Sequence, residues 1–345
     1  IKSMLKKKTS IAVGLLFLLG GFTGYNYYQK IFGKSIVKDT VLFVFSNDNL
    51  MDIRNKISKI SNDIDGFLWV AEKKGFTKPK SGRYVLNENM SNNDLVNLLR
   101  SGNQTPIKLS FNNQDTLEKL AGRIAQQLET DSISLLNSFK EPFFLSKNNL
   151  TEKSVLQIFV PNSYQFYWNT SPKKFRDKIF KEYQRFWNPS RRRKAAKLNL
   201  SATEVITLAS IVQKETSKEI ERPIVAGLYL NRLKKDWPLQ ADPTIIYCIR
   251  EIKGQNYKVK RVLNSDLEIN SPYNTYKNRG LPPTLIAMPD ISSIDGVLNA
   301  QKHNYLYMCV NVEKLGYHSF TKSLSQHNKN ASKYHKWLDK QRIRK

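Results

Sequence analysis

The chain has 345 residues, and its 56 Lys and Arg against 29 Asp and Glu give a formal charge of +27. A hydrophobic share of 40% is enough to fill a core, which excludes a globally disordered chain. Two cysteines exclude a disulfide scaffold and zinc knuckles built on CxxC pairs. The charge calls for a polyanionic neighbour, and nucleic acid, an anionic membrane surface and the carboxylate-rich bacterial wall all qualify.

The first thirty residues predict a membrane anchor. No charge occurs from Ser10 to Tyr28, a stretch about long enough to cross a hydrocarbon core. Tyrosines at its end suit a membrane interface, and the lysines before it favour a cytoplasmic N-terminus. We expect residues 1–32 to be a basic cytoplasmic tip and an uncleaved single-pass signal anchor in the bacterial inner membrane. The alternative is a cleaved signal peptide, although no small-residue cleavage site follows Leu19.

Either alternative places the remaining chain outside the cytoplasm, on the periplasmic side. This location weakens nucleic acid as a partner and favours a wall polymer or the outer leaflet. Residues 33–105 are predicted to form a small α+β unit: a strand at 41–45, a helix over 49–60, a turn and strand over 80–86, and a helix that Ser91 caps and Gly102 ends. A mere spacer is the alternative.

Residues 106–345 are predicted to form a larger α+β domain. We expect a strand at 107–111 and helices over 115–128 and about 172–187, with a basic helical tail over 329–345. The basic run 191–194 indicates a solvated helix face or, alternatively, a contact with an anionic polymer or lipid head groups. Cys248 and Cys309 lie in apolar runs expected to be strands, and buried free thiols are expected over a disulfide.

Glu215 is the candidate catalytic residue. Ser201 and Glu204 form a capping-box pattern that opens a helix running to about residue 216. At about 100° per residue, Glu215 continues the apolar stripe of Leu208 and Ile211. A carboxyl at the edge of a buried stripe is partly desolvated, which raises its pKa, and cleavage of a glycosidic bond needs such a proton-holding acid. The alternative is a glutamate at a frayed helix end, paired with a nearby Lys or Arg.

A second helix is expected after Pro223, and it should pair with the first and end near residue 234. Three proline-containing loops follow it. They are Leu239–Thr244, Ser271–Tyr276 and Gly280–Pro283. Their amides and hydroxyls could bind sugar hydroxyls, and their rings could stack on sugar faces. Ordinary turn chemistry is the alternative, because Asn, Pro, Ser and Gly are turn residues.

The strings LASIVQKET, NRL…WPLQADPTIIY, SPYNTY, GLPPT and H-S-F…HN occur in this order. Together they resemble the YceG-like (MltG) family of endolytic murein transglycosylases, over roughly residues 40–340 and most densely over 205–328. The resemblance implies a single-pass membrane enzyme whose catalytic part lies outside the cytoplasm. It also implies that 33–105 is a LysM-like subdomain and that 106–345 is the catalytic domain.

The resemblance places the family's catalytic glutamate on Glu215. It implies that this residue protonates the oxygen between N-acetylmuramic acid and N-acetylglucosamine in nascent strands. It then acts as base on the muramic C6 hydroxyl, which closes a 1,6-anhydro ring and limits strand elongation. Residues that match the family's motifs are expected to line the site: Tyr164, Gln240, Asp242, Ser271, Tyr273, Asn274 and Tyr276.

Two positions depart from the family pattern. The family often has VEKE and FPDTY where this chain has Val212–Glu215 as VQKE and Val160–Tyr164 as VPNSY. Asn162 therefore lacks a carboxylate, and Asp242 remains the candidate auxiliary carboxylate, expected to orient loops or substrate.

No metal or cofactor is expected, because the four histidines lack zinc spacing and no nucleotide-binding motif occurs. His318 and His327 match family positions, and we expect structural hydrogen bonds from them. The expected partners are peptidoglycan strands and the membrane, with peptidoglycan synthases as further candidates and no nucleic acid. Three other functions stay open: a weakly catalytic wall-binding scaffold, an anchored binder of nucleic acid or acidic polymers, and a hydrolytic muramidase that leaves reducing ends.

Overall fold

A computed structural model describes the backbone of residues 2–341 and the side chains of residues 11–341. The chain forms two compact units. The first comprises Ile1–Leu109, Gln127–Thr130 and Gln165–Ser171, and the second comprises Ser110–Gln126, Asp131–Tyr164 and Pro172–Lys345. Helices and small two-stranded sheets occur together, which confirms the expected mixed α and β class.

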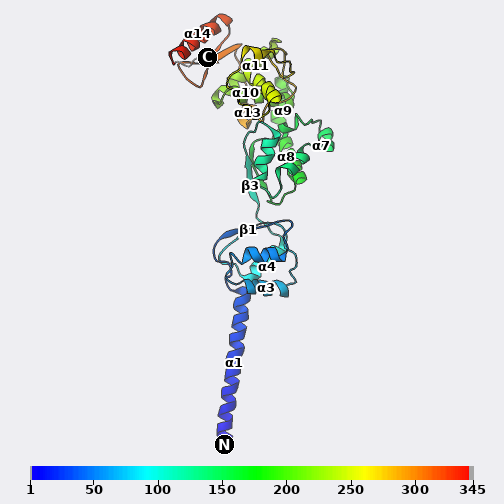
Figure 1. Cartoon of the computed structure of the whole chain (residues 1–345), viewed down its shortest axis with the longest axis vertical. Helices are drawn as coiled ribbons and strands as arrows, with labels where there is room; N and C mark the ends of the chain where they lie inside the picture. Colours follow the sequence, from blue (N-terminus) through cyan, green and yellow to red (C-terminus); the bar gives the residue numbers. More distant parts are fainter. Residues whose placement is uncertain (1, 342–345) are drawn as a thin grey trace. The chain divides into compact units, whose positions relative to one another are not determined.

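A long helix, α1 (Lys2–Phe32), opens the first unit (Figure 1). Its segment Ile11–Phe32 has 22 residues, is solvent-exposed, and is long and apolar enough to cross a membrane. This segment fits a single-pass anchor, and a signal sequence has the same features. The helix ends against the rest of its unit, where Asn92 donates a hydrogen bond to the Lys30 carbonyl at 3.0 Å.

The rest of the first unit packs three helices on a two-stranded sheet. Strands β1 and β2 pair antiparallel, with Thr40 opposite Leu86 and Val44 opposite Gly82. The elements are β1 (Thr40–Val44), α2 (Leu50–Ile57), α3 (Ile64–Lys73), β2 (Gly82–Leu86) and α4 (Asn92–Ser101).

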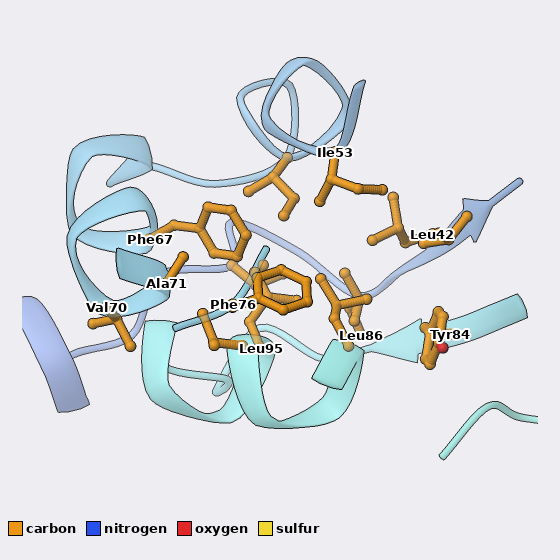
Figure 2. Close-up of a cluster of buried hydrophobic side chains, with 14 residues drawn as sticks. Leu42, Ile53, Phe67, Val70, Ala71, Phe76, Tyr84, Leu86 and Leu95 are labelled. Atoms are coloured by element: carbon orange, nitrogen blue, oxygen red, sulfur yellow. The ribbon is translucent and has the colours of Figure 1, made fainter. Parts of the chain in front are cut away.

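The core of this unit explains why these elements form. In Figure 2, Phe67 and Phe76 meet at the centre, with Ile53 of α2 on one side and Leu95 of α4 on another. Alternate strand residues and helix residues three or four apart supply this cluster, as their periodicity predicts. Helix α3 was not expected from the sequence, since its first turn contains a glycine, although Asp63 is a favourable N-cap.

The second unit contains most of the helices. Its elements, with the two strands that cross between the units, are β3 (Ile107–Phe111), α5 (Leu117–Ala125), α6 (Ser132–Phe139), α7 (Pro142–Lys147), η1 (Val155–Ile158), β4 (Asn162–Phe166), α8 (Pro172–Phe186), α9 (Pro189–Lys197), α10 (Ala202–Glu215), η2 (Glu219–Glu221), α11 (Arg222–Lys234), α12 (Asp242–Lys253), η3 (Asn264–Glu268), α13 (Ile291–Leu298), β5 (Tyr307–Val310), β6 (His318–Thr321) and α14 (Leu324–Lys340).

Helix α10 is the buried centre of this unit, in contact with α11 and α13 (Figure 1). All eight residues from Val205 to Val212 are buried. The predicted capping box is present: the Ser201 hydroxyl accepts a bond from the Glu204 N–H, and the Glu204 carboxylate accepts one from the Ser201 N–H. An apolar helix of this kind depends on packing on every side for its stability.

The apolar run around Cys248 was expected to be a strand, and that expectation is wrong. It lies in α12, where Ile245, Cys248 and Ile249 form one buried face at helical spacing. A short apolar run does not distinguish a strand from a buried helix, and Pro243 in the first turn favours the helix here. The strand expected around Cys309 is confirmed as β5, which pairs antiparallel with β6.

The basic run Arg191–Lys194 lies in α9 and is largely bonded within its own unit. Arg191 pairs with Asp295 at 3.2 Å, and Lys194 donates to the Asn299 side chain at 2.6 Å. Both partners lie in or next to α13. These contacts support a structural role in fixing α9 against α13 over a free surface for an anionic polymer.

Candidate active site

Glu215 is the last residue of α10, and the chain turns to extended backbone at Thr216. The helix core holds this end in place, because the preceding residues are buried against α11 and α13. The Glu215 carboxyl is surrounded by protein atoms yet keeps partial access to solvent. An acid in this position can exchange a proton with a bound substrate.

The environment of Glu215 favours its protonated form. Burial is the largest influence and raises the pKa of this carboxyl above the ordinary glutamate value. Positive charge at His318, the hydrogen bond from Tyr229 and the charge of Arg232 oppose the rise, whereas the charge of Asp242 adds to it. The balance leaves a raised pKa, as the sequence predicted for a carboxyl on an apolar stripe.

Helix α11 supplies two polar side chains to this acid. The Tyr229 hydroxyl donates to Glu215 Oε2 at 3.2 Å, and the residue is only 1% exposed. Burial, followed by the charge of Glu215, raises the pKa of Tyr229, so its phenol remains a donor. Arg232 follows three residues later on the same helix face and donates to the carbonyl groups of Leu239 and Leu306 at 2.6 and 2.8 Å.

A buried carboxylate lies behind the site. Glu221, 4% exposed, accepts bonds from the backbone N–H of His318 at 2.7 Å and from the Thr216 hydroxyl at 3.0 Å. Its Oε2 also lies 3.1 Å from Nδ1 of the His318 ring. These contacts bind strand β6 to the segment that follows Glu215.

Asp242 and Tyr276 form a second polar pair in the site. The Tyr276 hydroxyl donates to Asp242 Oδ1 at 2.5 Å, and burial followed by this bond raises the pKa of Tyr276. The backbone supports the pair: the Gln240 N–H donates to the Thr275 carbonyl, and the Ala241 N–H donates to the Thr275 hydroxyl, both at 3.0 Å. Two of the expected loops are therefore joined beside Glu215, whose charge acts on Tyr276.

The remaining predicted residues of the second loop are committed to the loop itself. Asn274 is fully buried and donates to the carbonyl groups of Leu267 and Ile269, both at 2.8 Å. The Tyr273 hydroxyl shares a 2.7 Å hydrogen bond with the Thr284 hydroxyl. The Ser271 hydroxyl accepts a 3.2 Å bond from the Tyr273 N–H. These contacts favour a supporting role over direct contact with a substrate.

Tyr164 belongs to a different cluster of the second unit. Its hydroxyl donates to the Val160 carbonyl at 2.6 Å, and its ring stacks on Phe111 at 5.6 Å. The charge that raises its pKa, after burial, is that of Glu182. The described contacts therefore do not bring Tyr164 together with Glu215.

An aromatic edge borders the polar group. The exposed ring of Trp237 meets Tyr307 at 5.9 Å, and Tyr307 stacks on His327 at 5.4 Å. Arg232 lies 6.0 Å from the Tyr307 ring. Flat apolar rings beside an acid suit a sugar substrate.

The sequence reasoning missed Tyr229, Arg232 and Glu221. The first two lie three residues apart on a helix already expected to pair with the one that ends in Glu215. This spacing was an available signal. No local signal distinguishes Glu221 from an ordinary surface glutamate, because its burial depends on a strand 97 residues later.

Comparisons with known proteins agree on one family. The model of the YceG-like family matches residues 43–333. The endolytic murein transglycosylase of Bacillus subtilis (strain 168) is 29% identical over 78% of this chain and 76% of its own length. That of Streptococcus pneumoniae serotype 2 (strain D39) is 26% identical over 92% of this chain. The chain spans 63% of the pneumococcal protein. A crystal structure of a yceG-like protein from Listeria monocytogenes matches with a TM-score of 0.56 and 26% identity, over 85% of this chain and 98% of that one.

Proposed function

The chain belongs to the YceG-like family, and from this membership we propose that it cleaves nascent peptidoglycan strands internally with Glu215 as acid and base. Its curated relatives are named as enzymes, and the chain is accordingly a peptidoglycan transglycosylase. We propose in addition that the bond cleaved joins N-acetylmuramic acid to N-acetylglucosamine, that the product carries a 1,6-anhydro end, and that Glu215 is the catalytic residue. One observation carries it: a single carboxyl with a raised pKa at the end of a buried helix, hydrogen-bonded by Tyr229.

The reaction takes one proton from Glu215 and returns one. Glu215 protonates the oxygen between N-acetylmuramic acid and N-acetylglucosamine, and the bond from muramic C1 to that oxygen breaks. The glucosamine residue leaves with a free 4-hydroxyl. The muramic C6 hydroxyl then attacks C1, its proton passes to the Glu215 carboxylate, and a 1,6-anhydro ring closes. Because the nucleophile belongs to the substrate, no second carboxylate is needed for attack.

Two neighbours stabilise the carboxylate between these steps. The Tyr229 phenol already donates to Glu215 Oε2, and this bond strengthens when the acceptor becomes charged. Arg232 adds positive charge from a buried position, with its guanidinium held by two backbone carbonyls. Such preorganised groups lower the barrier because they need no rearrangement during the reaction.

Asp242 has a positioning role in this proposal. Its carboxylate accepts the bond from Tyr276, which joins the start of α12 to the 271–276 loop. Asp242 also raises the pKa of Glu215, so it keeps the acid protonated. Gln240 and Tyr276, next to this pair, are the predicted residues best placed to meet a sugar.

We further propose that α1 anchors the protein and that the rest of the first unit, together with the second unit, lies outside the cytoplasm. The apolar segment Ile11–Phe32 supports the anchor, and nascent glycan strands emerge at that membrane surface. An internal cut there limits strand elongation. Peptidoglycan synthases, which make these strands, are the proposed protein partners.

Mass spectrometry of muropeptides tests the reaction. Full-length protein in detergent is incubated with uncrosslinked glycan, as wild type, Glu215→Gln and Glu204→Gln. Wild type is expected to make 1,6-anhydro ends, and Glu215→Gln to lose at least about 10²-fold in rate because the proton donor is gone. Glu204→Gln is the matched control, since a glutamine preserves the capping box at the other end of the same helix.

The alternatives give different products. Reducing ends from wild type would indicate a hydrolytic muramidase, and Asp242 would then be the first candidate to activate water. Glycan binding without cleavage in any variant would contradict the proposal and favour a wall-binding scaffold.

A further inference from the structure

The buried carboxylate of Glu221 has no part in the proposed reaction. Burying a carboxylate is costly unless donors surround it. Three donors do so here: the His318 N–H, the His318 ring and the Thr216 hydroxyl. Two of the three come from one residue, and the third immediately follows Glu215. This arrangement positions a histidine with respect to the catalytic acid.

Glu221 selects one orientation of the His318 ring. Its Oε2 lies 3.1 Å from Nδ1, so Nδ1 carries the proton and donates. Among the described residues, none is hydrogen-bonded to Nε2. A buried carboxylate behind an imidazole also stabilises the ring when it is charged, as in carboxylate–histidine pairs that orient a reactive group.

The hydrogen bond between Thr216 and Glu221 brings His318 to the segment that directly follows Glu215. Burial of Glu215 raises its pKa, and the charge of His318 is the largest single influence in the opposite direction. The other groups that face this acid are Tyr229 and Arg232 from α11, Asp242 from α12, and Tyr276 from the 271–276 loop. The charge of Glu215 raises the pKa of Tyr276. Arg232 is fixed by two carbonyls, whereas His318 is a cation only when protonated.

We propose that His318, oriented by Glu221, is a positioning residue that stabilises the Glu215 carboxylate after it has given up its proton. The inference rests on the proposed acid and base role of Glu215. No bond forms or breaks at His318, and its contribution is electrostatic. The expected role of His318 as a purely structural hydrogen-bonding residue is thereby extended.

The pH profile of anhydro-end formation tests this role in the full-length protein. Because the charge of His318 lowers the pKa of Glu215, His318→Gln is expected to raise that pKa. The acid then stays protonated to higher pH, so the alkaline limb moves up by about half a pH unit or more. The maximal rate falls by on the order of 10-fold to 10²-fold, because a charge that stabilises the carboxylate is missing. Glu221→Gln is expected to move the limb in the same direction.

His335→Gln is the matched control, since His335 is exposed on α14 and takes no part in the site. It is expected to leave the profile unchanged. Reduced rates with an unmoved alkaline limb in both His318→Gln and Glu221→Gln would show a merely structural role and overturn the proposal. A limb that moves to lower pH would also overturn it.

Nuclear magnetic resonance keeps the proposal testable without turnover, and its first measurement uses the wild type alone. In wild type labelled with ¹⁵N-histidine, the neutral form of the His318 ring is expected to carry its proton on Nδ1, and the Nε2–H tautomer would overturn the assignment. The pKa of the ¹³C-labelled Glu215 carboxyl is expected to rise in His318→Gln. If wild type makes no anhydro ends, the proposed function fails, and these two measurements still decide the coupling between His318 and Glu215.

Discussion

At the residue scale, Glu215 differs from other glutamates only in where its helix places it. Partners from three other elements surround it: Tyr229 from α11, His318 from β6 and Asp242 from α12. Their effects on the pKa of Glu215 oppose one another, and burial, the largest influence, leaves that pKa raised. Such a site lowers the stability of the folded protein, because a desolvated carboxyl destabilises the folded state whenever it is ionised.

Glu215→Gln is therefore expected to stabilise the protein at neutral and alkaline pH. A raised folded-state pKa means that the folded protein binds this proton more tightly, so stability falls as pH rises past the unfolded pKa of glutamate. The gain should be about 1.4 kcal/mol for each unit of the rise and should vanish at acidic pH, where both forms are neutral. Thermal unfolding at pH 8 and at pH 4 measures it. An equal gain at both pH values would contradict a raised pKa.

At the element scale, the first turn of α10 stabilises the helix and its last turn positions Glu215. Its first turn is closed by the Ser201 and Glu204 capping box, which satisfies donors that the helix leaves free. Its last turn carries the acid. The buried residues between the two ends make the helix a rigid support. The capping box at its first turn therefore also helps to hold Glu215 in position at its last turn.

Ser201→Ala is expected to cost about 1 kcal/mol, because the Glu204 N–H loses its side-chain acceptor. The free energy of unfolding in guanidinium chloride measures the loss. Glu204→Gln serves as control and should stay close to wild type, since a glutamine can also bond the Ser201 N–H. An equal loss in Glu204→Gln would contradict this control, because it would show that the Glu204 charge also stabilises this turn.

At the scale of the whole molecule, a net charge of +27 requires a negatively charged surrounding. A wall polymer that carries peptide carboxylates provides one at the membrane surface proposed for this chain. Part of the basic charge is neutralised within the protein, as in the pair of Arg191 with Asp295. The remainder is available for long-range attraction, which acts on binding and not on the chemical step.

Association with uncrosslinked glycan is expected to slow by on the order of ten-fold when salt rises from low to high ionic strength. Screening shortens the range over which the positive surface attracts the polymer. Glu215→Gln should show the same salt dependence, because it removes the acid but hardly changes the net charge. Stopped-flow fluorescence with labelled glycan measures this rate, and a salt-independent rate would show that the charge does not drive binding.

The local features of this protein follow from its sequence alone. The capping box at Ser201, the left-handed glycine at position 102 and the apolar stripe that leads to Glu215 are all confirmed. Each depends on residues within a few positions of one another. The apolar run at Cys248 shows the limit of this reasoning, since a helix and a strand can bury the same short segment.

Which side chains share the site depends on how elements far apart in the sequence pack together. Tyr229 reaches Glu215 across 14 residues, Tyr276 reaches Asp242 across 34, and His318 reaches Glu221 across 97. The motifs predicted that Tyr164 and Asn274 would also line the site. In the structure, Tyr164 bonds the Val160 carbonyl and the buried Asn274 bonds the carbonyl of Leu267 instead. The physical reason is that periodicity and caps act through neighbouring residues, whereas a pKa and a hydrogen bond depend on which surfaces the packed helices bring together.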